Sequence, residues 1–191
     1  VTGQSDPKQD WPYIQPGPAD GWAGGKSHTF RILFGLSKAP SGGECQLVLD
    51  YVDTHSTVPP KLAIKINDVS FERQLPKGAG DDSAFGQPEK GREHVETVEF
   101  PAQALKRGTN EISITSATGS WILYDCVALK TPAGVETGPL DAANKLLGVD
   151  TQPFLVRRDG KLYQPVLASV LHVGEPVEAS VAVDGVEPVR H

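Results

Sequence analysis

The chain has 191 residues and a formal net charge of −6 at pH 7, and 22% of its residues are charged. The basic residues form no stripe that could follow a phosphate backbone, so we expect no nucleic-acid partner. No apolar run approaches the length that spans a membrane, so we expect no membrane partner either. Gly 20 and Pro 16 are spread along the chain, which indicates short strands joined by many turns.

Residues 1–9 are polar, and we expect them to be flexible. The next stretch, DWPYIQPGPADGWAGG at 10–25, contains three prolines, which forbid a helix and disfavour a central strand. It is therefore predicted to be an ordered loop that presents Trp11, Tyr13 and Trp22. Two interpretations stay open: the rings form a stacking platform for the CH-rich face of a sugar, or they are packing anchors that seal one edge of the fold.

Alternating apolar residues predict a series of β-strands after this loop. The expected strands span residues 28–36, 44–52, 61–66, 69–75, 95–100, 110–115 and 121–129. We also expect a turn at Asn67 and Asp68, a single helical turn at 101–106, and a long loop at 76–91, a length that is more often functional or mobile than neutral. Such a series with scarcely any helix predicts an all-β fold, a jelly-roll β-sandwich.

The last two of these strands are expected to form a hairpin around a small, polar turn at 116–120. Ile112 and Ile114 alternate with polar residues, which predicts a strand with one solvated face. The strand at 121–129 is nearly all apolar, which predicts burial on both of its faces. Tyr124 and Asp125 interrupt it, so their polar atoms require hydrogen-bond partners or a metal ion.

Cys45 and Cys126 are the two cysteines of the chain, and each lies in an expected strand. They are either a disulfide that joins two strands, which points to an oxidising compartment, or two separate buried thiols. A disulfide requires strands whose backbones already lie close together. Neither cysteine has a second cysteine or a histidine at ligand spacing, so we expect no zinc site.

Residues 131–153 are expected to be a linker with a short helix at 141–148, which Asp141 would cap and Gly148 would end. Further strands are predicted at 155–156, 161–173 and 177–183. We interpret residues 154–191 as a short, partial second β unit, the truncated start of an immunoglobulin-like β domain. The chain begins with Val1 and contains no Met, so we expect a piece excised from a longer protein.

Four stretches carry a family resemblance: WPYIQPGPADGWAGG, LPKGAGDDSAFG with the following KGREH, PAQALKRGTNEISIT and SWILYDCVAL. Over residues 10–130 they resemble the C-terminal β-sandwich domain of family 4 polysaccharide lyases, the rhamnogalacturonan lyases. The resemblance implies a non-catalytic, carbohydrate-binding-like module similar to galactose-binding-like jelly rolls, because the catalytic residues of those lyases lie on a separate, larger domain.

The same resemblance implies a polysaccharide or oligosaccharide partner such as a pectic glycan, and a neighbouring catalytic domain in the parent chain. It also implies a secreted or periplasmic location. This chain departs from the family pattern because it continues past the module, so the parent protein need not be a lyase.

The segment at 110–129 is also similar to calcium-containing carbohydrate-binding modules, in which an Asp of the last strand helps to hold a structural Ca²⁺ ion. Asp125 occupies the comparable position. Calcium takes several oxygen ligands, backbone carbonyls among them. The alternative is that Asp125 hydrogen-bonds to the backbone of a loop.

Sugar binding is expected at loops on one end of the sandwich. Trp11, Tyr13 and Trp22 would stack on sugar rings, and five polar residues would contact hydroxyl or carboxylate groups: Asp53, His55, Arg92, Glu93 and His94. Arg92 suits a uronate carboxylate, which it can grip through two hydrogen bonds, or it forms a salt bridge within its own loop. Trp121 begins a buried strand and is expected in the core rather than in the site.

Three functional classes remain. The first is a carbohydrate-binding module of a larger polysaccharide-degrading enzyme, the second is a structural sandwich that braces a catalytic neighbour, and the third is a catalytic lyase fragment. A lyase requires a base such as Lys, His or Tyr beside a cation that neutralises the uronate. The chain contains no HExxH motif, and the polar cluster in KGREH is typical of many surface loops, so we expect no catalytic residues here.

Overall fold

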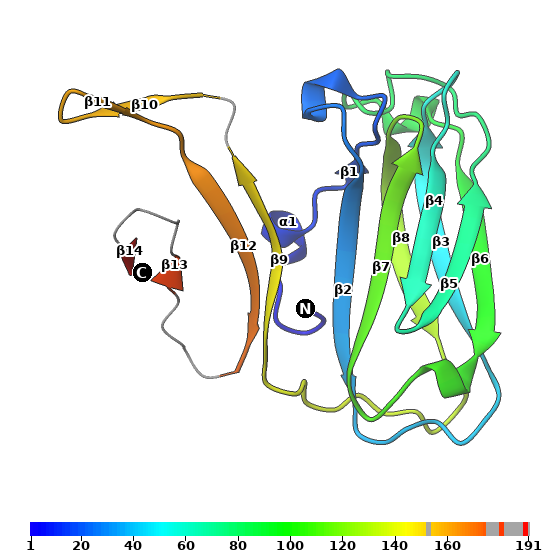
Figure 1. Ribbon diagram of the computed structural model, residues 1–191. Helices are drawn as coiled ribbons and strands as arrows, with labels where there is room; N and C mark the ends of the chain where they lie inside the picture. The colour runs from blue at the N-terminus through cyan, green and yellow to red at the C-terminus, as the bar shows by residue number, and fades with distance from the viewer. Residues whose placement is uncertain (152–153, 175–179, 182–188, 191) are drawn as a thin grey trace. The chain divides into compact units, whose positions relative to one another are not determined.

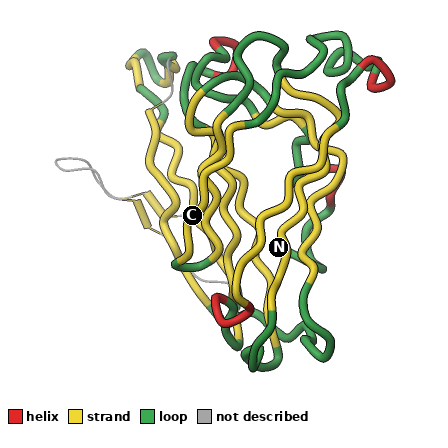
Figure 2. Tube along the Cα trace, turned by 90° about the vertical axis from the view of Figure 1, so that its right-hand side faces the viewer, coloured by secondary structure: helices red, strands yellow, loops and turns green. Residues whose placement is uncertain are grey.

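Eight strands form the first part of the chain: β1 (Ile14–Gln15), β2 (His28–Leu36), β3 (Glu44–Thr54), β4 (Lys61–Ile66), β5 (Val69–Gln74), β6 (His94–Pro101), β7 (Gly108–Thr118) and β8 (Ile122–Lys130). They build two antiparallel four-stranded sheets, in the orders β1-β8-β3-β6 and β2-β7-β4-β5. The two sheets face one another, and the loops gather at the two ends of the strands (Figure 1, Figure 2). This strand order is that of a jelly roll, so the predicted fold class is confirmed.

The computed structural model describes residues 1–151, 154–174, 180–181 and 189–190. The chain divides into two units, Val1–Pro139 and Leu140–His191. Helix in the described part of the chain is confined to α1 (Pro7–Asp10) and three 3-10 turns, η1 (Gly21–Ala23), η2 (Pro88–Lys90) and η3 (Ala102–Ala104). None of the described helices has the length and the apolar surface that a membrane crossing demands.

The core of the first unit lies between its two sheets and is formed by the apolar half of each alternating strand. On β3, Leu47 and Leu49 are fully buried, and on β4 Leu62 and Ile64 are buried in the same way. Each such side chain contributes about 1.5–3 kcal/mol on leaving water. Strands β2 and β4 have the predicted bounds, because strict alternation between a wet and a dry face marks a strand clearly in the sequence.

Strands β7 and β8 do not form the predicted hairpin. β7 pairs with β2 and β4 in one sheet, whereas β8 pairs with β1 and β3 in the other, so residues 119–121 carry the chain from one sheet to the other. The prediction of two buried faces on β8 is also wrong, because Asp125 and Cys126 are exposed. Closeness in sequence favours a hairpin, but it does not determine which sheet a strand joins.

Buried Gln15 ties the two sheets together at the short strand β1. Its Nε2 donates to the backbone oxygens of His28 and Ile114 in the opposite sheet, at 2.8 and 2.7 Å. Its Oε1 accepts a 2.8 Å hydrogen bond from the hydroxyl of Tyr124 on β8. Tyr124 therefore has the partner that its position in an apolar strand requires, and burial raises the pKa of its hydroxyl well above the ordinary value.

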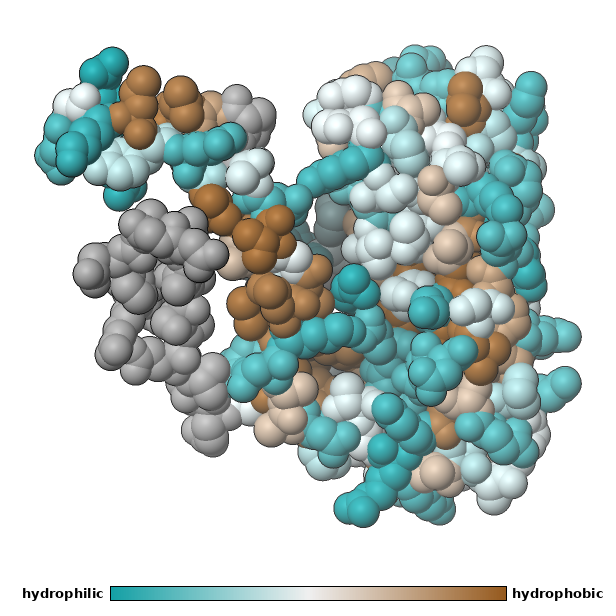
Figure 3. Space-filling view, in the orientation of Figure 1, coloured by the Kyte–Doolittle hydropathy of each residue, from teal (hydrophilic) through white to brown (hydrophobic). Residues whose placement is uncertain are grey.

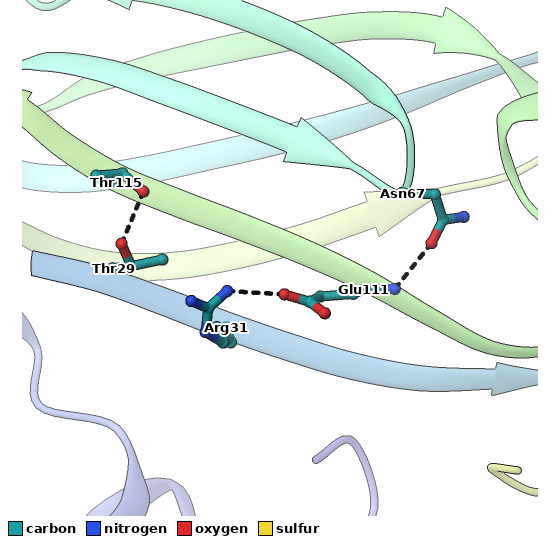
Figure 4. A network of polar contacts seen from close by, with 5 residues as sticks. All are labelled: Thr29, Arg31, Asn67, Glu111 and Thr115. Atoms are coloured by element: carbon teal, nitrogen blue, oxygen red, sulfur yellow. Dashed lines mark hydrogen bonds and ion pairs between the residues drawn. The ribbon is translucent and has the colours of Figure 1, made fainter. Parts of the chain in front are cut away.

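The outer face of the β2-β7-β4-β5 sheet is polar, and cross-strand contacts order it (Figure 4). The hydroxyls of Thr29 and Thr115 share a 2.8 Å hydrogen bond, and Arg31 forms a 2.8 Å ion pair with Glu111. Asn67, whose φ of 51° fits the predicted turn between β4 and β5, accepts a 3.0 Å hydrogen bond from the backbone N–H of Glu111. An exposed ion pair such as Arg31–Glu111 contributes little to stability, about 0–1 kcal/mol.

The N-terminal residues belong to the first unit. The backbone N–H of Thr2 donates to Leu33 on β2 at 2.8 Å, and the Asp6 side chain caps α1 by accepting a 2.9 Å hydrogen bond from the backbone of Lys8. At the other end, the N–H of Gly138 donates to Gly35 on β2 at 2.9 Å. The unit is therefore longer at both ends than the module expected at residues 10–130.

Cys45 and Cys126 are free, and the sheet register explains why. They lie in neighbouring strands, but Cys126 is opposite Asp50, which is five residues along β3 from Cys45. At about 3.3 Å per residue, that offset is too large for a disulfide. The other interpretation, two buried thiols, holds for Cys45 only, because Cys126 is exposed.

In the second unit, β9 (Ala143–Thr151) pairs with β12 (Val166–Val173), so the predicted helix at 141–148 is wrong. The remaining pairs are β10 (Val156–Arg158) with β11 (Lys161–Tyr163), and β13 (Ser180–Val181) with β14 (Val189–Arg190). Hydrophobic side chains gather on β9 and β12 (Figure 3), where Leu146 and Val170 are more than half exposed. Most of the strand predicted at 177–183 lies outside the described residues, and the immunoglobulin-like domain stays a prediction.

Candidate functional site

The loops at one end of the sandwich, at the top of Figure 1, surround an open pocket, which we call the loop-end pocket. Its volume is about 540 Å³, within the range of small-molecule sites. Among the residues that the structure describes, eight line the pocket, and we call them its described lining: Ile14, Asp20, Trp22, His55, Asp81, Ala84, Phe85 and Trp121. These residues come from separate stretches of the sequence, so the pocket forms only when the strands have brought the loops together.

Three aromatic residues line the pocket. Trp22, on η1, is 69% exposed, and Phe85, in the loop between β5 and β6, is 81% exposed. Trp121 is only 5% exposed and lies edge-to-face with the His55 ring, with a centroid separation of 6.1 Å. Large apolar rings that stay in water around a pocket are typical of a binding surface.

His55 is held by its own loop. Its Nδ1 accepts hydrogen bonds from the backbone N–H groups of Thr57 and Val58, at 3.2 and 3.1 Å. A nitrogen that accepts these bonds carries no hydrogen, so the hydrogen-bond pattern assigns a neutral ring with its hydrogen on Nε2. The Nε2–H group can therefore donate to a ligand hydroxyl.

Backbone hydrogen bonds join this loop to the turn that precedes β8. The N–H of His55 donates to the carbonyl of Trp121 at 3.2 Å, and the N–H of Ser120 donates to the carbonyl of Val58 at 2.9 Å. Two side chains of the pocket, the imidazole and the buried indole, are thus fixed relative to each other by the main chain.

Asp20 holds the loop of Trp22 against the same turn. It is 5% exposed; one of its oxygens accepts a 2.7 Å hydrogen bond from the N–H of Gly17, and the other accepts a short hydrogen bond from the Ser120 hydroxyl. Gly119 has a φ of 83°, and a Cβ there would collide with the carbonyl of Pro59. The turn therefore requires glycine at this position.

Asp53 is not a ligand contact, contrary to the prediction, because it is fully buried. Its Oδ1 accepts a 2.8 Å hydrogen bond from the backbone N–H of Ala79, and its Oδ2 accepts a 2.7 Å hydrogen bond from the Ser83 hydroxyl. A Cβ at Gly78 would collide with this carboxylate. Asp53 therefore positions the loop between β5 and β6, which carries two of the pocket residues.

Of the three aromatic residues predicted to stack on a sugar, only Trp22 belongs to the described lining of the pocket. Trp11 packs edge-to-face on Phe30 and Tyr124, with centroid separations of 4.6 and 5.8 Å, as the anchor interpretation expects. Tyr13 is 47% exposed just before β1, outside that lining.

Among the predicted polar residues, His55 alone belongs to the described lining. Arg92 is exposed and donates to the backbone oxygen of Lys77 at 3.2 Å. Glu93 is exposed, and His94 begins β6 with its ring 5.4 Å from that of Tyr51. The Arg92–His94 cluster therefore lies at the end of the sandwich that carries the pocket, but not in its described wall.

Asp125 is exposed where the register between β3 and β8 shifts by one residue. Within the ranges that the structure describes, no group of three or more His, Cys, Asp or Glu residues could hold a metal ion. The surroundings of Asp125 thus do not supply a side-chain ligand set of the kind calcium prefers. The structural Ca²⁺ ion stays a prediction.

Sequence reasoning missed Asp20, Asp81 and Phe85 and placed Trp121 in the core. Trp121 is indeed buried, but it lines the pocket as well. The length of the loop at 76–91 predicted a function without indicating which residue faces the pocket. Phe85 was the available signal, because it is the one large apolar side chain in an otherwise polar stretch of that loop.

A comparison with known families agrees with this architecture. Residues 1–129 match the family described as "CBM-like: Polysaccharide lyase family 4, domain III", where CBM stands for carbohydrate-binding module. The chain belongs to this family. The match spans more than half of the chain, and it confirms the resemblance found in the sequence. The match ends within β8, so Leu140–His191 lies beyond this CBM-like domain.

Solved structures of carbohydrate-active proteins are similar to part of this chain. A family 35 carbohydrate-binding module from an environmental isolate has 18% identity and a TM-score of 0.40, over 61% of this chain and 72% of that one. The family 35 module of Abf62 from Cellvibrio japonicus has 12% identity and a TM-score of 0.40, over 60% and 73%. An exo-β-1,3-galactanase from Phanerochaete chrysosporium has 19% identity and a TM-score of 0.35, over 60% and 25%. No curated protein matches the chain.

Proposed function

We propose that the CBM-like domain binds a glycan at the loop-end pocket and performs no catalysis there. The observation that carries the proposal is the presence of two exposed rings, Trp22 and Phe85, beside hydrogen-bonding side chains in one pocket. Aromatic rings stack on the CH-rich face of a sugar. The Nε2–H of His55 and the carboxylate of Asp81 can then donate to and accept from its hydroxyls.

The chemistry of the pocket supports binding rather than cleavage. A polysaccharide lyase requires a base beside a cation that stabilises the developing negative charge. The described lining contains no lysine or arginine, and the Nδ1 of its histidine, His55, is occupied by backbone hydrogen bonds. We therefore assign the chemistry to a neighbouring catalytic domain of the parent protein.

For the target we propose a plant cell-wall glycan of the pectic class, because the matched family is a domain of polysaccharide lyases and the sequence resembles the rhamnogalacturonan lyases among them. A secreted or periplasmic location goes with this proposal, since such polymers are degraded outside the cell. A structural Ca²⁺ ion at Asp125 is a further part of the proposal; because no group of three or more His, Cys, Asp or Glu side chains gathers there among the described residues, backbone carbonyl oxygens would have to supply most of its ligands.

The proposal is tested by calorimetric and Trp-fluorescence titration against pectic, arabinan, galactan and xylan oligosaccharides, in calcium and in chelator. We expect saturable binding of at least one pectic ligand, with a change in emission because Trp22 and Trp121 line the pocket. Loss of binding in chelator would support the calcium site. Binding of none of these ligands by a folded domain would overturn the proposal in favour of a structural brace, in which Trp22 and Phe85 pack against a neighbouring domain.

A further inference from the structure

The loop-end pocket is acidic. Asp20 and Asp81 both belong to its described lining, and no lysine or arginine is among the described residues that form it. His55 adds no positive charge in the hydrogen-bonded form seen here, because its Nδ1 accepts from two backbone N–H groups.

Two cationic groups at or beside the neighbouring loop are engaged elsewhere. Lys90 forms a 2.8 Å ion pair with Asp82, and Arg92 donates to the backbone oxygen of Lys77. Arg92 is the residue that the sequence suggested as a clamp for a uronate carboxylate. Since it lies outside the described lining, a uronate in the pocket would face carboxylates without a compensating guanidinium.

We infer that the loop-end pocket selects uncharged sugar residues and rejects uronates, an inference that rests on the glycan-binding function proposed above. A neutral sugar offers hydroxyl donors to the carboxylate of Asp81 and a CH-rich face to Trp22 and Phe85. A uronate presents a like charge to Asp20 and Asp81, which disfavours its binding. On a pectic polymer, the domain therefore holds the neutral sugars and leaves the galacturonate units free.

The test compares neutral sugars with uronates and includes one pair, galactoside and galacturonide, that differs only at C6. Methyl galactoside and methyl galacturonide, with the methyl glycosides of rhamnose, arabinose and glucuronate, are titrated by NMR, following the indole N–H signals of Trp22 and Trp121. At low ionic strength we expect the best neutral glycoside to bind at least about fivefold more tightly than either uronide, and the ratio to shrink in 0.5 M NaCl.

Variants of two adjacent carboxylates separate local charge from overall charge. Asp81→Asn is expected to raise the affinity for galacturonide about threefold or more. The ratio of the affinity for neutral glycosides to that for uronides should therefore fall. Asp82→Asn is the matched control: it removes the same formal charge from a side chain that pairs with Lys90 outside the described lining, and it should leave the ratio within twofold.

Uronides that bind the unaltered domain as tightly as the neutral glycosides would overturn the inference and leave glycan binding intact. A neutral preference that persists unchanged in Asp81→Asn and at high salt would overturn it as well, because charge would not be its cause. If no glycoside and no polymer fragment binds the folded domain, the proposed function itself fails, so the two failures are distinguishable.

Discussion

Asp53 on β3 and Ser83 in the loop between β5 and β6 are joined by a buried 2.7 Å hydrogen bond that spans 30 residues of sequence. Asp53 is fully buried, and Ser83 is 3% exposed. The bond connects the rigid interior of the sandwich to the loop that brings Asp81 and Phe85 to the pocket. Part of the pocket is therefore positioned by a buried residue that does not line it.

Ser83→Ala is expected to lower the free energy of unfolding by about 1–3 kcal/mol, because it leaves Oδ2 of Asp53 buried without that donor. Urea unfolding measures this effect. Ser70→Ala, on the exposed side of β5, is the control and should change stability by less than about 0.5 kcal/mol. Equal effects of the two substitutions would contradict a structural role for the Asp53 contact.

Trp22→Ala is expected to weaken glycan binding roughly tenfold or more while leaving the thermal midpoint nearly unchanged, because the ring is 69% exposed and contributes little to the core. Calorimetry and thermal melts give the two quantities. Tyr13→Ala removes another exposed ring that does not belong to the described lining, and we expect it to leave affinity within about twofold. If both variants bind glycan as tightly as the unaltered domain, Trp22 does not stack on the sugar.

Two buried tyrosines should respond differently to loss of their hydroxyl at pH 7. Tyr124 donates to Gln15, so Tyr124→Phe leaves Oε1 of Gln15 without a donor and should cost about 1–2 kcal/mol. The hydroxyl of Tyr51 is buried and has no hydrogen-bond partner among the described residues, so Tyr51→Phe should be neutral or stabilising. A larger loss in Tyr51→Phe than in Tyr124→Phe would refute this assignment.

The same tyrosines predict a loss of stability in alkali. Burial raises the pKa of both hydroxyls well above the ordinary value, and for Tyr51 the charge of Glu96 adds to the effect. The unfolded chain releases these protons above about pH 10 while the folded domain keeps them, so the contribution is complete below that pH and declines above it. In urea titrations at pH 9–11 we expect the slope of stability against pH to steepen through pH 10 and to approach about 1.4 kcal/mol per pH unit for each tyrosine near pH 11.

Each tyrosine-to-phenylalanine variant should remove its own share of that slope. An alkaline slope that is the same in Tyr51→Phe, in Tyr124→Phe and in the unaltered domain would show that other groups cause the decline.

The two cysteines are expected to differ in reactivity. Cys126 is exposed, so an aromatic disulfide reagent should modify it rapidly at pH 8. Cys45 is buried, and burial raises the pKa of its thiol, so it should react only when urea unfolds the domain. Cys126→Ser should abolish the rapid phase. Two thiols that react only after a reductant is added would instead indicate a disulfide.

Much of the sandwich could be predicted because alternation is a local property. The bounds of β2 and β4 follow from side chains that alternate between core and solvent, such as Ile64 and Lys65. Which sheet a strand joins is a non-local property, and for that reason the adjacent strands β7 and β8 were predicted as a hairpin. The helix prediction at 141–148 was wrong for another reason. The short apolar run of this segment fits either a helix or a strand, and its pairing with β12 makes it a strand.

The candidate site shows the same division. Trp22 and His55 could be selected by residue type, because an exposed ring and a loop histidine suit a sugar. Asp53 could not be excluded from the site by sequence alone. The groups that donate to its carboxylate, the N–H of Ala79 and the hydroxyl of Ser83, lie far from it in the sequence. Phe85 could not be placed, because its position depends on how the loop is anchored to β3.

The short strand β1 also has a consequence for how the chain folds. It pairs with β8, and its Gln15 meets Tyr124 across 109 residues of sequence. Contacts of such long range form slowly, because the entropy lost in ordering the intervening chain precedes the favourable free energy of the contact itself. As the protein leaves the ribosome, β1 has no strand to pair with until β8 has emerged. The lateral edge that β1 covers is thus expected to be the last part of the sandwich to close, and the part most open to mispairing with another nascent copy.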